Sequence, residues 1–335
     1  MASDQMSLPN APEISGLRFR HFRGEDDYPQ MVAANLASAQ ADGVETTLTV
    51  EFITQAFQNL TNCDPYQDIL IAEADGKIIG YSRGSWVDEP EGCMYQHIGV
   101  LVPAWRRKGI GSAILQWMET HLREVAATHP PEMVKFFRPN GISYRETGRI
   151  TMLERAGYRP IRFFHNMVRP TLDDIQEFPL PVGLEVRPAL PEHYRAIWTQ
   201  VDNTSKDEWG YSEPTEEKYQ EWLTDPHFQP DLWQVAWDVA TEKPIGSVLT
   251  FIDHAENEKY NRKRGYTEGI GVVHAWRRQG IARALIALSL QAQKAAGMTE
   301  SALVADSDSV SNVTHLYESC GFQTIYTDSI YRKPF

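Results

Sequence analysis

The sequence predicts two consecutive α/β domains. Its 335 residues are enough for two domains that each bury their own hydrophobic core. Segments of the first half return in the same order in the second half, and each series runs strand, helix, hairpin, strand, helix. A proline-containing stretch separates the two series. This repeated mixture of strands and helices predicts the fold class.

The composition is that of a globular protein with a net negative charge. Hydrophobic residues make up 42% and charged residues 23%, and the formal net charge is -13. Proteins that bind nucleic acids or anionic membranes use clustered lysine and arginine, so this balance argues against both kinds of partner. The three cysteines form no CxxC pair, so neither a metal site nor a disulfide framework is expected.

Targeting signals are also missing from the sequence. The first residues lack the basic stretch and apolar run of a signal peptide. No stretch approaches the roughly 18 apolar residues that a membrane span needs. We therefore expect a cytoplasmic protein, either a monomer or a homodimer.

Each half opens with a short strand and a helix, and a hairpin follows. Residues 16–32 and 183–198 both read as an alternating strand, an acidic turn and the start of an amphipathic helix. Residues 68–84 then form two strands around a tight Asp-Gly turn, and residues 231–251 follow the same plan with a longer turn.

The sharpest repeat is a strand, a basic turn and a helix. Residues 102–115 read VPAWRRKGIGSAIL, and residues 273–286 read VHAWRRQGIARALI, with no gap between them. Apolar strands at residues 98–102 and 269–273 precede the two turns, and apolar residues at helical spacing follow them.

A boundary near residue 175 separates the halves. The stretch 170–183 carries Pro170, Pro179 and Pro181, and prolines suit a linker better than a helix or a central strand. The predicted division is a disordered N-terminus over residues 1–14, an N-terminal domain over 15–172, a linker over 173–182 and a C-terminal domain over 183–335.

The basic turn has the chemistry of a phosphate site. Small residues let a ligand approach the backbone, and the helix start offers unpaired N–H groups at the positive end of its dipole. Several such bonds to an ionised pyrophosphate, at roughly 1.5–3 kcal/mol each, would form a binding site. A turn of this kind can also be a mere connection, but its return in the same order in both halves favours a site.

Other phosphate motifs do not fit these turns. Neither half contains the P-loop pattern GxxxxGK[ST], and GIGSAI and GIARAL lack the third glycine of a dinucleotide fingerprint. The remaining pattern, Arg-x-x-Gly-x-Gly/Ala after a strand, resembles the pyrophosphate-binding motif of the GNAT N-acetyltransferase superfamily. The resemblance covers nearly the whole chain apart from the N-terminus and the linker.

This resemblance implies acetyl-CoA as the co-substrate, no metal, and two GNAT domains that each have a mixed, mostly antiparallel sheet flanked by helices. It assigns acetyl-CoA binding to Arg106, Arg107, Lys108, Gly109 and Gly111 in the first half and to Arg277, Arg278, Gln279, Gly280, Ile281 and Ala282 in the second half. Backbone groups around Ile270, Gly271 and Val272 are expected to bind the pantetheine arm and the acetyl oxygen.

The second half also matches the family's distal motif, and the first half does not. The matching residues are Asn312, Leu316, Tyr317, Gly321 and Phe322. In the family, Asn312 would join the acetyl-CoA site and Tyr317 would be the general acid that protonates the CoA thiolate, a role that suits a phenol. The first half has Leu153 opposite Tyr317, and leucine cannot donate a proton. The resemblance therefore makes the C-terminal domain catalytic and the N-terminal domain degenerate.

The attacking amine needs a base. An amine with a pKa near 10 is ammonium at pH 7, and removing its proton costs about 4 kcal/mol. GNAT enzymes often use a carboxylate on the strand before the pyrophosphate turn, which points to Glu268; the first half has His97 at this position. The plainer alternatives are a solvated strand-edge residue for Glu268 and a core aromatic for Tyr317.

The function that follows is transfer of the acetyl group of acetyl-CoA to a primary amine of a small-molecule acceptor, by direct attack in a ternary complex. A non-catalytic acetyl-CoA-binding regulator is one alternative. A protein-lysine acetyltransferase is another, because the charged stretch 254–264 could face a peptide. An acyltransferase that uses a longer acyl-CoA also stays open.

Overall fold

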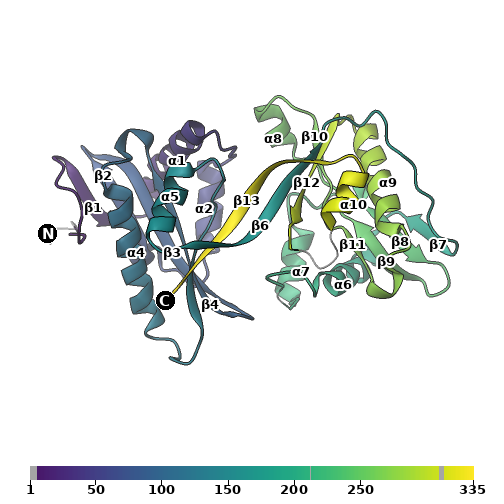
Figure 1. Ribbon diagram of the computed structural model, residues 1–335, viewed down its shortest axis with the longest axis horizontal. Helices are drawn as coiled ribbons and strands as arrows, with labels where there is room; N and C mark the ends of the chain where they lie inside the picture. Colours follow the sequence, from purple (N-terminus) through teal and green to yellow (C-terminus); the bar gives the residue numbers. More distant parts are fainter. Residues whose placement is uncertain (1–5, 212, 309–312) are drawn as a thin grey trace. The chain divides into compact units, whose positions relative to one another are not determined.

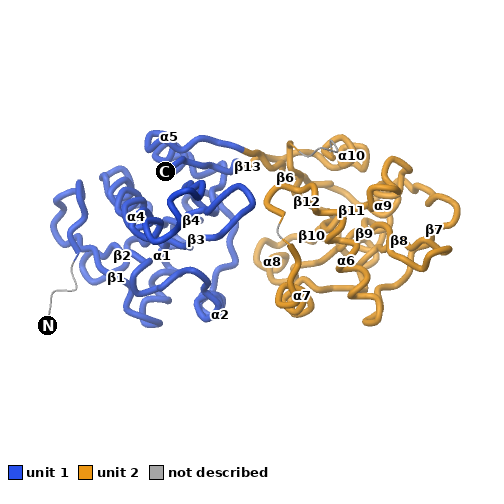
Figure 2. The backbone as a smooth tube through the Cα atoms, turned by 90° about the horizontal axis from the view of Figure 1, so that it is seen from below, with its two compact units in different colours: residues 1–161, 329–335 blue, residues 162–328 orange. Residues whose placement is uncertain are grey.

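The computed structural model contains ten α-helices and thirteen strands in its described part, which comprises residues 6–211, 213–308 and 313–335 (Figure 1). The chain forms two compact units (Figure 2). Unit 1 consists of residues 1–161 and 329–335, and unit 2 consists of residues 162–328.

Unit 1 is built on a mixed sheet with the order β1-β2-β3-β4-β5-β13. The elements are β1 (Leu17–His21), η1 (Glu25–Asp27), α1 (Tyr28–Asp42), α2 (Val50–Gln58), α3 (Pro65–Asp68), β2 (Ile69–Ala74), β3 (Lys77–Glu89), β4 (Gly92–Leu101), η2 (Pro103–Trp105), α4 (Ile110–Ala126), β5 (Lys135–Pro139), α5 (Thr147–Arg155) and the start of β6 (Arg159–Arg169). β4 and β5 pair in parallel, and the other neighbours pair antiparallel. The predicted mixed, mostly antiparallel sheet is confirmed.

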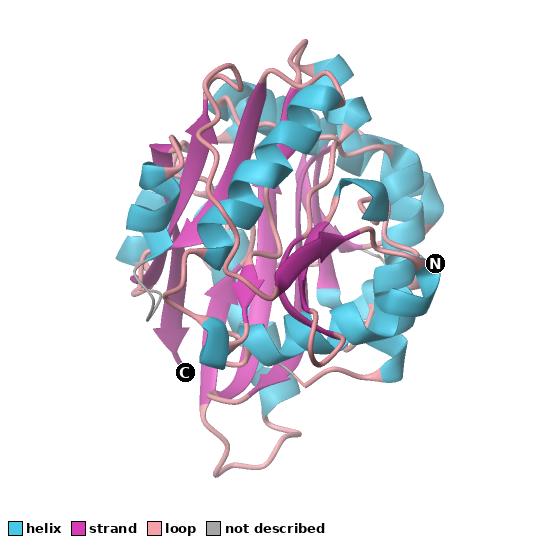
Figure 3. Ribbon diagram, turned by 90° about the vertical axis from the view of Figure 1, so that its right-hand side faces the viewer, coloured by secondary structure: helices cyan, strands magenta, loops and turns pink. Residues whose placement is uncertain are grey.

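Helices cover both faces of this sheet, because side chains alternate along each strand. In β2, Ile69 and Ile71 belong to the buried cluster that includes Met31 of α1. Leu70 belongs to a second cluster, which includes Ile110 of α4. Two helices on opposite faces bury the sheet as the central layer, and Figure 3 shows helices flanking the strands.

Unit 2 repeats the plan with a sheet that is split. Its elements are β7 (Leu184–Arg187), η3 (Pro191–His193), α6 (Tyr194–Ser205), α7 (Glu216–Leu223), η4 (Pro230–Leu232), β8 (Gln234–Asp238), β9 (Lys243–Val248), α8 (His254–Lys259), β10 (Arg264–Tyr266), β11 (Gly271–Val272), η5 (His274–Trp276), α9 (Ile281–Ala295), β12 (Glu300–Asp306), α10 (Val313–Ser319) and the start of β13 (Gln323–Pro334). β7, β8, β9 and β11 form one antiparallel sheet. β12 pairs in parallel with β10 and antiparallel with β6.

The core of unit 2 also lies on two faces. Val235 of β8 belongs to the cluster that includes Ile197 of α6, and its neighbour Ala236 belongs to the cluster that includes Leu285 of α9. The helices after the first strand and after the basic turn thus take the same places relative to the sheet as α1 and α4 in unit 1.

The two units exchange their last strands. Residues 164–169 of β6 follow the first half of the chain but pair with β12 in unit 2. Lys333 and Pro334 of β13 follow the second half but pair with β5 in unit 1. The units therefore are not the continuous segments 15–172 and 183–335 that the linker prolines indicate.

The local elements agree with the sequence pattern. The predicted hairpin of residues 68–84 turns at Asp75 and Gly76, with φ values of 49° and 76°. The N-terminal residues from position 6 onward lie on unit 1: Met6 bridges Phe19, and Leu8 is buried. Among the described residues, no helix combines the length and the apolar character that a bilayer span requires.

Candidate active site

The two basic turns have the same backbone conformation. The second arginine of each has a positive φ, 60° at Arg107 and 67° at Arg278. The glycine two residues later has a φ of 85° at Gly109 and 82° at Gly280, and it caps α4 or α9. Glycine takes this left-handed conformation without steric cost, so the chain can turn sharply from strand to helix. The repeat in sequence is thus a repeat in geometry.

Both helix starts present free backbone donors. The first hydrogen bond of α4 runs from the Ala113 N–H to the Gly109 carbonyl at 3.1 Å, and that of α9 from Ala284 to Gly280 at 3.0 Å. The three N–H groups before each donor have no acceptor within the helix. A Cβ placed on Gly280 would meet no atom within 4 Å, so the approach to α9 is open. Both turns can accommodate a pyrophosphate.

The first arginine of each turn braces the turn itself. Arg106 Nε donates to the Leu101 carbonyl at 3.1 Å, and its two terminal nitrogens bind the Asp42 carboxylate at 2.7 and 2.8 Å. Arg277 Nε donates to the Val272 carbonyl at 3.0 Å. Each guanidinium ties the turn back to the strand that precedes it. The motif arginine therefore has a structural reason to recur.

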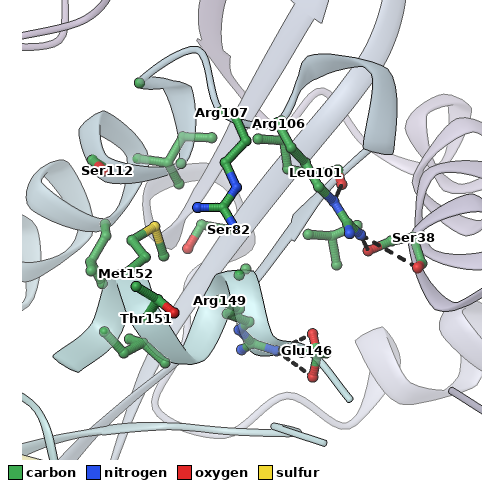
Figure 4. A pocket seen from close by; sticks show the side chains of 18 of the residues that line it. Ser38, Ser82, Leu101, Arg106, Arg107, Ser112, Glu146, Arg149, Thr151 and Met152 are labelled. Atoms are coloured by element: carbon green, nitrogen blue, oxygen red, sulfur yellow. Dashed lines mark hydrogen bonds and ion pairs between the residues drawn. The ribbon is translucent and has the colours of Figure 1, made fainter. Parts of the chain in front are cut away.

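A cavity of about 370 Å³ lies beside the turn of unit 1 (Figure 4). Two of its arginines are neutralised, Arg106 by Asp42 and Arg149 by Glu146 at 3.2 Å. The Arg107 side chain points into the cavity in Figure 4. No described residue forms an ion pair with Arg107, which leaves a positive charge for an anionic ligand.

The strands of unit 1 separate beside this cavity. The parallel pairing of β4 with β5 ends at His97 and Pro139, and the Asn140 N–H donates to the His97 carbonyl at 2.8 Å. Beyond this point β4 pairs with β3 as far as Leu101. Past His97, the backbone groups of β4 that face away from β3 thus have no described partner strand beyond Asn140.

The cavity of unit 1 contains no functional acid or base at the two expected positions. Burial lowers the pKa of His97 to about 3, so its imidazole stays neutral. Its Nε2 lies 2.9 Å from the Tyr158 hydroxyl, and burial raises the pKa of that phenol. Leu153 also lines the cavity, and its side chain has no group that can donate a proton.

The corresponding strands of unit 2 separate at the corresponding residues. β10 pairs with β12 up to Tyr266 and Ala302, and the Thr267 N–H still donates to the Ala302 carbonyl at 2.9 Å. The Glu268 carbonyl then accepts from the Leu249 N–H at 2.7 Å, on the other side. β11 continues along β9. Residues 267–270 thus cross from one sheet to the other.

A cavity of about 280 Å³ lies at this crossing. It contains Glu268 and Ile270 from the crossing, Val304 from β12 and Tyr317 from α10, together with Glu208 from the turn after α6. The structure therefore places the two predicted catalytic side chains in the wall of one cavity. They come from segments about 50 residues apart in sequence, as is common for side chains assembled by tertiary structure.

Tyr317 lines this cavity with a largely buried side chain. The residue is 7% exposed, and no described residue forms a hydrogen bond with the hydroxyl. Burial, together with the negative charge of Glu208, raises the pKa of the phenol. The phenol therefore keeps its proton across the physiological range, which is the state that a general acid needs.

Glu268 is suited to accept a proton. The residue keeps solvent exposure at the cavity, but its carboxylate is surrounded closely enough that burial raises its pKa above the ordinary value of 4.5. His227 opposes this shift through its charge. A raised pKa makes the carboxylate a stronger base.

Comparison with known proteins agrees with this geometry. The model of the acetyltransferase (GNAT) family matches residues 37–133 and 193–322. The chain belongs to the GNAT family. A search of curated protein sequences found no match. Each matched region contains one basic turn, so both halves are GNAT regions.

Solved structures share the fold over the whole chain. A GCN5-related N-acetyltransferase from Sphaerobacter thermophilus aligns with a TM-score of 0.72 at 23% identity, covering 98% of this chain and 97% of its own. A tandem GNAT protein from the clavulanic acid biosynthesis pathway aligns with a TM-score of 0.63 at 14% identity, covering 95% and 98%. The GCN5-related glucosamine N-acetyltransferase region of a fungal multi-domain β-N-acetylglucosaminidase aligns with a TM-score of 0.66 at 16% identity, covering 97% of this chain and 39% of that protein. All three share the fold of nearly the whole chain, and the second is described as a tandem GNAT protein.

The predicted GNAT backbone site lies at the strand crossing. Ile270 lines the cavity of unit 2, whereas Gly271 and Val272 form β11. A Cβ on Gly271 would come within 2.3 Å of the Thr204 hydroxyl, so α6 packs there only because position 271 is glycine. Val272 is 9% exposed and belongs to the core.

The remaining predicted residues lie on the two turns, with one exception. Arg278, Gln279 and Lys108 are exposed, and Lys108 stacks over Trp105 at 4.6 Å. The other predicted positions are the buried Ile281, the half-buried Ala282 and, in unit 1, the cavity residues Gly109 and Gly111. Asn312 lies outside the described residues.

Three functional candidates were not predicted from the sequence. Glu208 and Thr204 line the cavity of unit 2, and both come from the end of α6 and the turn after it. Arg169, from β6, donates to the carbonyl of Cys320 behind Tyr317. No local motif marks these residues, because their roles depend on contacts between distant segments.

Proposed function

We propose that unit 2 transfers the acetyl group of acetyl-CoA to a primary amine of a small-molecule acceptor. The observation that carries this proposal is the position of Glu268 and Tyr317 in the wall of one cavity at the strand crossing of a GNAT region. A base and an acid beside the same cavity support direct attack within a ternary complex, without a covalent acyl-enzyme.

The residues of unit 2 fit acetyl-CoA as a co-substrate. The free N–H groups at the start of α9 would hold the pyrophosphate, and the turn at Gly280 leaves room for it. Arg278 and Gln279 are exposed beside the helix start. The backbone near Ile270, where strand pairing is interrupted, would bind the pantetheine arm and the thioester oxygen.

Glu268 takes a proton from the acceptor ammonium, and the free amine then attacks the thioester carbon. A new C–N bond forms and the C–S bond breaks, while Tyr317 gives its proton to the departing sulfur. The nitrogen then loses its second proton, which restores the Tyr317 phenol, and Glu268 releases the first proton to solvent. Deprotonating the amine costs about 4 kcal/mol at pH 7, and a carboxylate with a raised pKa reduces that cost.

Unit 1 is proposed to bind acetyl-CoA without transferring the acetyl group. Its cavity, its free Arg107 and its basic turn support binding. Its neutral His97 and its Leu153 supply neither the base nor the acid.

The test is turnover of acetyl-CoA with a panel of small amines and lysine peptides, for the wild type and Tyr317→Phe in parallel. We expect transfer to a small amine, with kcat in the variant reduced about 100-fold or more and CoA binding retained. Transfer to peptides in preference to amines would favour a protein-lysine acetyltransferase. Tight CoA binding without turnover on any acceptor would refute the enzyme and leave the regulator.

A further inference from the structure

The cavity of unit 2 is acidic. Among the described residues that line it, the charged ones are Glu208 and Glu268, and the others are apolar, hydroxyl-bearing or glycine. Glu268 belongs to the strand crossing, and Glu208 belongs to the turn after α6. Two carboxylates from separate segments thus face one small space.

Neighbouring cations are committed to other groups. Arg277 donates to the Val272 carbonyl and lies 3.5 Å from Asp207. Arg162 binds Asp306 through two nitrogens, one of them at 2.7 Å. No described lysine or arginine lies within ion-pair distance of Glu208 or Glu268.

These carboxylates are compensated only in part, because burial outweighs the charge of Arg277 near Glu208 and that of His227 near Glu268. Burial and the nearby charge of Asp306 raise the pKa of Glu208, although Arg277 and the hydrogen bond from Ser205 oppose the shift. Burial also raises the pKa of Glu268. A bound cation would relieve the cost of keeping each carboxylate ionised away from bulk water.

An independent observation indicates that the cavity receives a ligand. Tyr317 is 7% exposed and lines the cavity, and its hydroxyl has no hydrogen-bond partner among the described residues. An unpaired hydroxyl on an otherwise buried side chain is a donor that a ligand in the cavity can engage.

We propose that the acceptor of unit 2 is a small dication, in which one ammonium group reacts between Glu268 and Tyr317 while a second cationic group binds Glu208. This inference rests on the proposed function and names its substrate class. A diamine, or an amino compound with a second basic nitrogen, meets the requirement.

The charge balance distinguishes this class from other amines. A monoamine would neutralise one carboxylate and leave the other without a counter-charge. An amino acid would bring its own carboxylate close to Glu208, and like charges in a partly buried site repel each other strongly. The cavity volume of about 280 Å³ is at the small end of ligand sites, which suits a compact acceptor.

The test compares 1,4-diaminobutane, butylamine and 4-aminobutanoate as acceptors for the full chain, since these share a four-carbon backbone and differ in charge. We expect kcat/KM to be highest for the diamine. Glu208→Gln should lower kcat/KM for the diamine about 10- to 100-fold through KM and change that for butylamine less than about twofold. Glu213→Gln, an exposed carboxylate outside the cavity on the same segment, is the matched control and should change neither.

A second variant keeps the test decisive if Glu208→Gln folds poorly. Glu208→Lys should invert the preference and make 4-aminobutanoate a better acceptor than the diamine. Equal kcat/KM for the three acceptors in the wild type, or equal losses for diamine and butylamine in Glu208→Gln, would overturn the inference and leave the acetyltransferase intact.

Calorimetric titration of the full chain with 1,4-diaminobutane in the presence of CoA distinguishes failure of the dication site from failure of the acetyltransferase proposal. Binding that Glu208→Gln weakens, without turnover, would support the dication site and refute the catalytic proposal. Absence of binding would overturn the inference, whatever the turnover with other amines.

Discussion

Arg169 donates a hydrogen bond from Nη1 to the carbonyl oxygen of Cys320, three residues after Tyr317. Its other nitrogens donate to the carbonyls of Thr171 at 2.9 Å and Asp174 at 2.6 Å, and Arg169 is 9% exposed. A Cβ on Gly321 would come within 2.3 Å of Nη1, so glycine makes room for the guanidinium. The end of β6 therefore fixes the turn behind the helix that carries Tyr317.

Replacing Arg169 should destabilise unit 2. Arg169→Met leaves three carbonyl groups without their charged donor, and we expect the free energy of unfolding to fall by about 3 kcal/mol. Urea denaturation followed by tryptophan fluorescence measures this change. Arg195→Met, which removes an exposed ion pair to Glu216, should cost less than about 1 kcal/mol. Equal losses in the two variants would contradict a bracing role for Arg169.

The pH dependence of activity should report Glu268. Its carboxyl must be ionised to accept a proton, so kcat/KM should rise with pH through an apparent pKa above 4.5, because burial raises this pKa. Glu268→Gln should abolish this rise and lower kcat about 100-fold or more. Measuring the pH profile with acceptors of different basicity identifies the group that titrates. If the apparent pKa of the profile moves with the pKa of the acceptor, it belongs to the amine, and if it stays fixed, it belongs to Glu268. A profile unchanged in Glu268→Gln would exclude this residue as the base.

The two turns should bind acetyl-CoA independently. Calorimetric titration of the wild type should give two sites per chain. Gly109→Asp should remove one site and leave kcat unchanged, whereas Gly280→Asp should remove the other site and abolish turnover, because a carboxylate at the helix start repels the pyrophosphate. Gly109→Asn and Gly280→Asn are the matched controls, because asparagine has the same steric cost at a positive φ but no charge. Both should retain most of the acetyl-CoA binding. A single site that Gly280→Asp eliminates would refute binding by unit 1.

The last residues of the chain should stabilise unit 1. Tyr331 is 5% exposed in the core of that unit, Lys333 binds Glu119 at 2.6 Å, and Phe335 stacks on Phe137 with ring centroids 4.3 Å apart. Deleting residues 329–335 removes the strand that pairs with β5, and we expect hydrogen exchange in β4 and β5 to accelerate about 100-fold or more. Tyr331→Phe, which loses a hydrogen bond of 3.3 Å to Glu154 and keeps the ring, should have little effect. Unchanged protection after the deletion would show that unit 1 folds without this strand.

Much of this protein follows from its sequence, because local sterics decide local structure. The basic turns repeat in conformation because Gly109 and Gly280 provide the left-handed φ that ends a strand and starts a helix. The hairpin at Asp75 and Gly76 follows for the same reason. The alternation of apolar residues placed the helices on the two faces of each sheet. Glu268 and Tyr317, which the motifs singled out, line one cavity, and their catalytic roles stay predictions.

Other features were decided by tertiary structure. Which sheet accepts β6 or β13 depends on strand edges that lie far away in sequence, and no short pattern specifies this choice. The charge of the motif arginines Arg106 and Arg277 suggests that they bind phosphate. In the structure, however, Nε of each guanidinium donates a hydrogen bond to a carbonyl of the preceding strand. Glu208 reaches the cavity only because α6 packs closely on Gly271. The sequence by itself determined the turns and the elements and singled out Glu268 and Tyr317, whereas the packing of distant segments determined which other charged side chains line the same cavity.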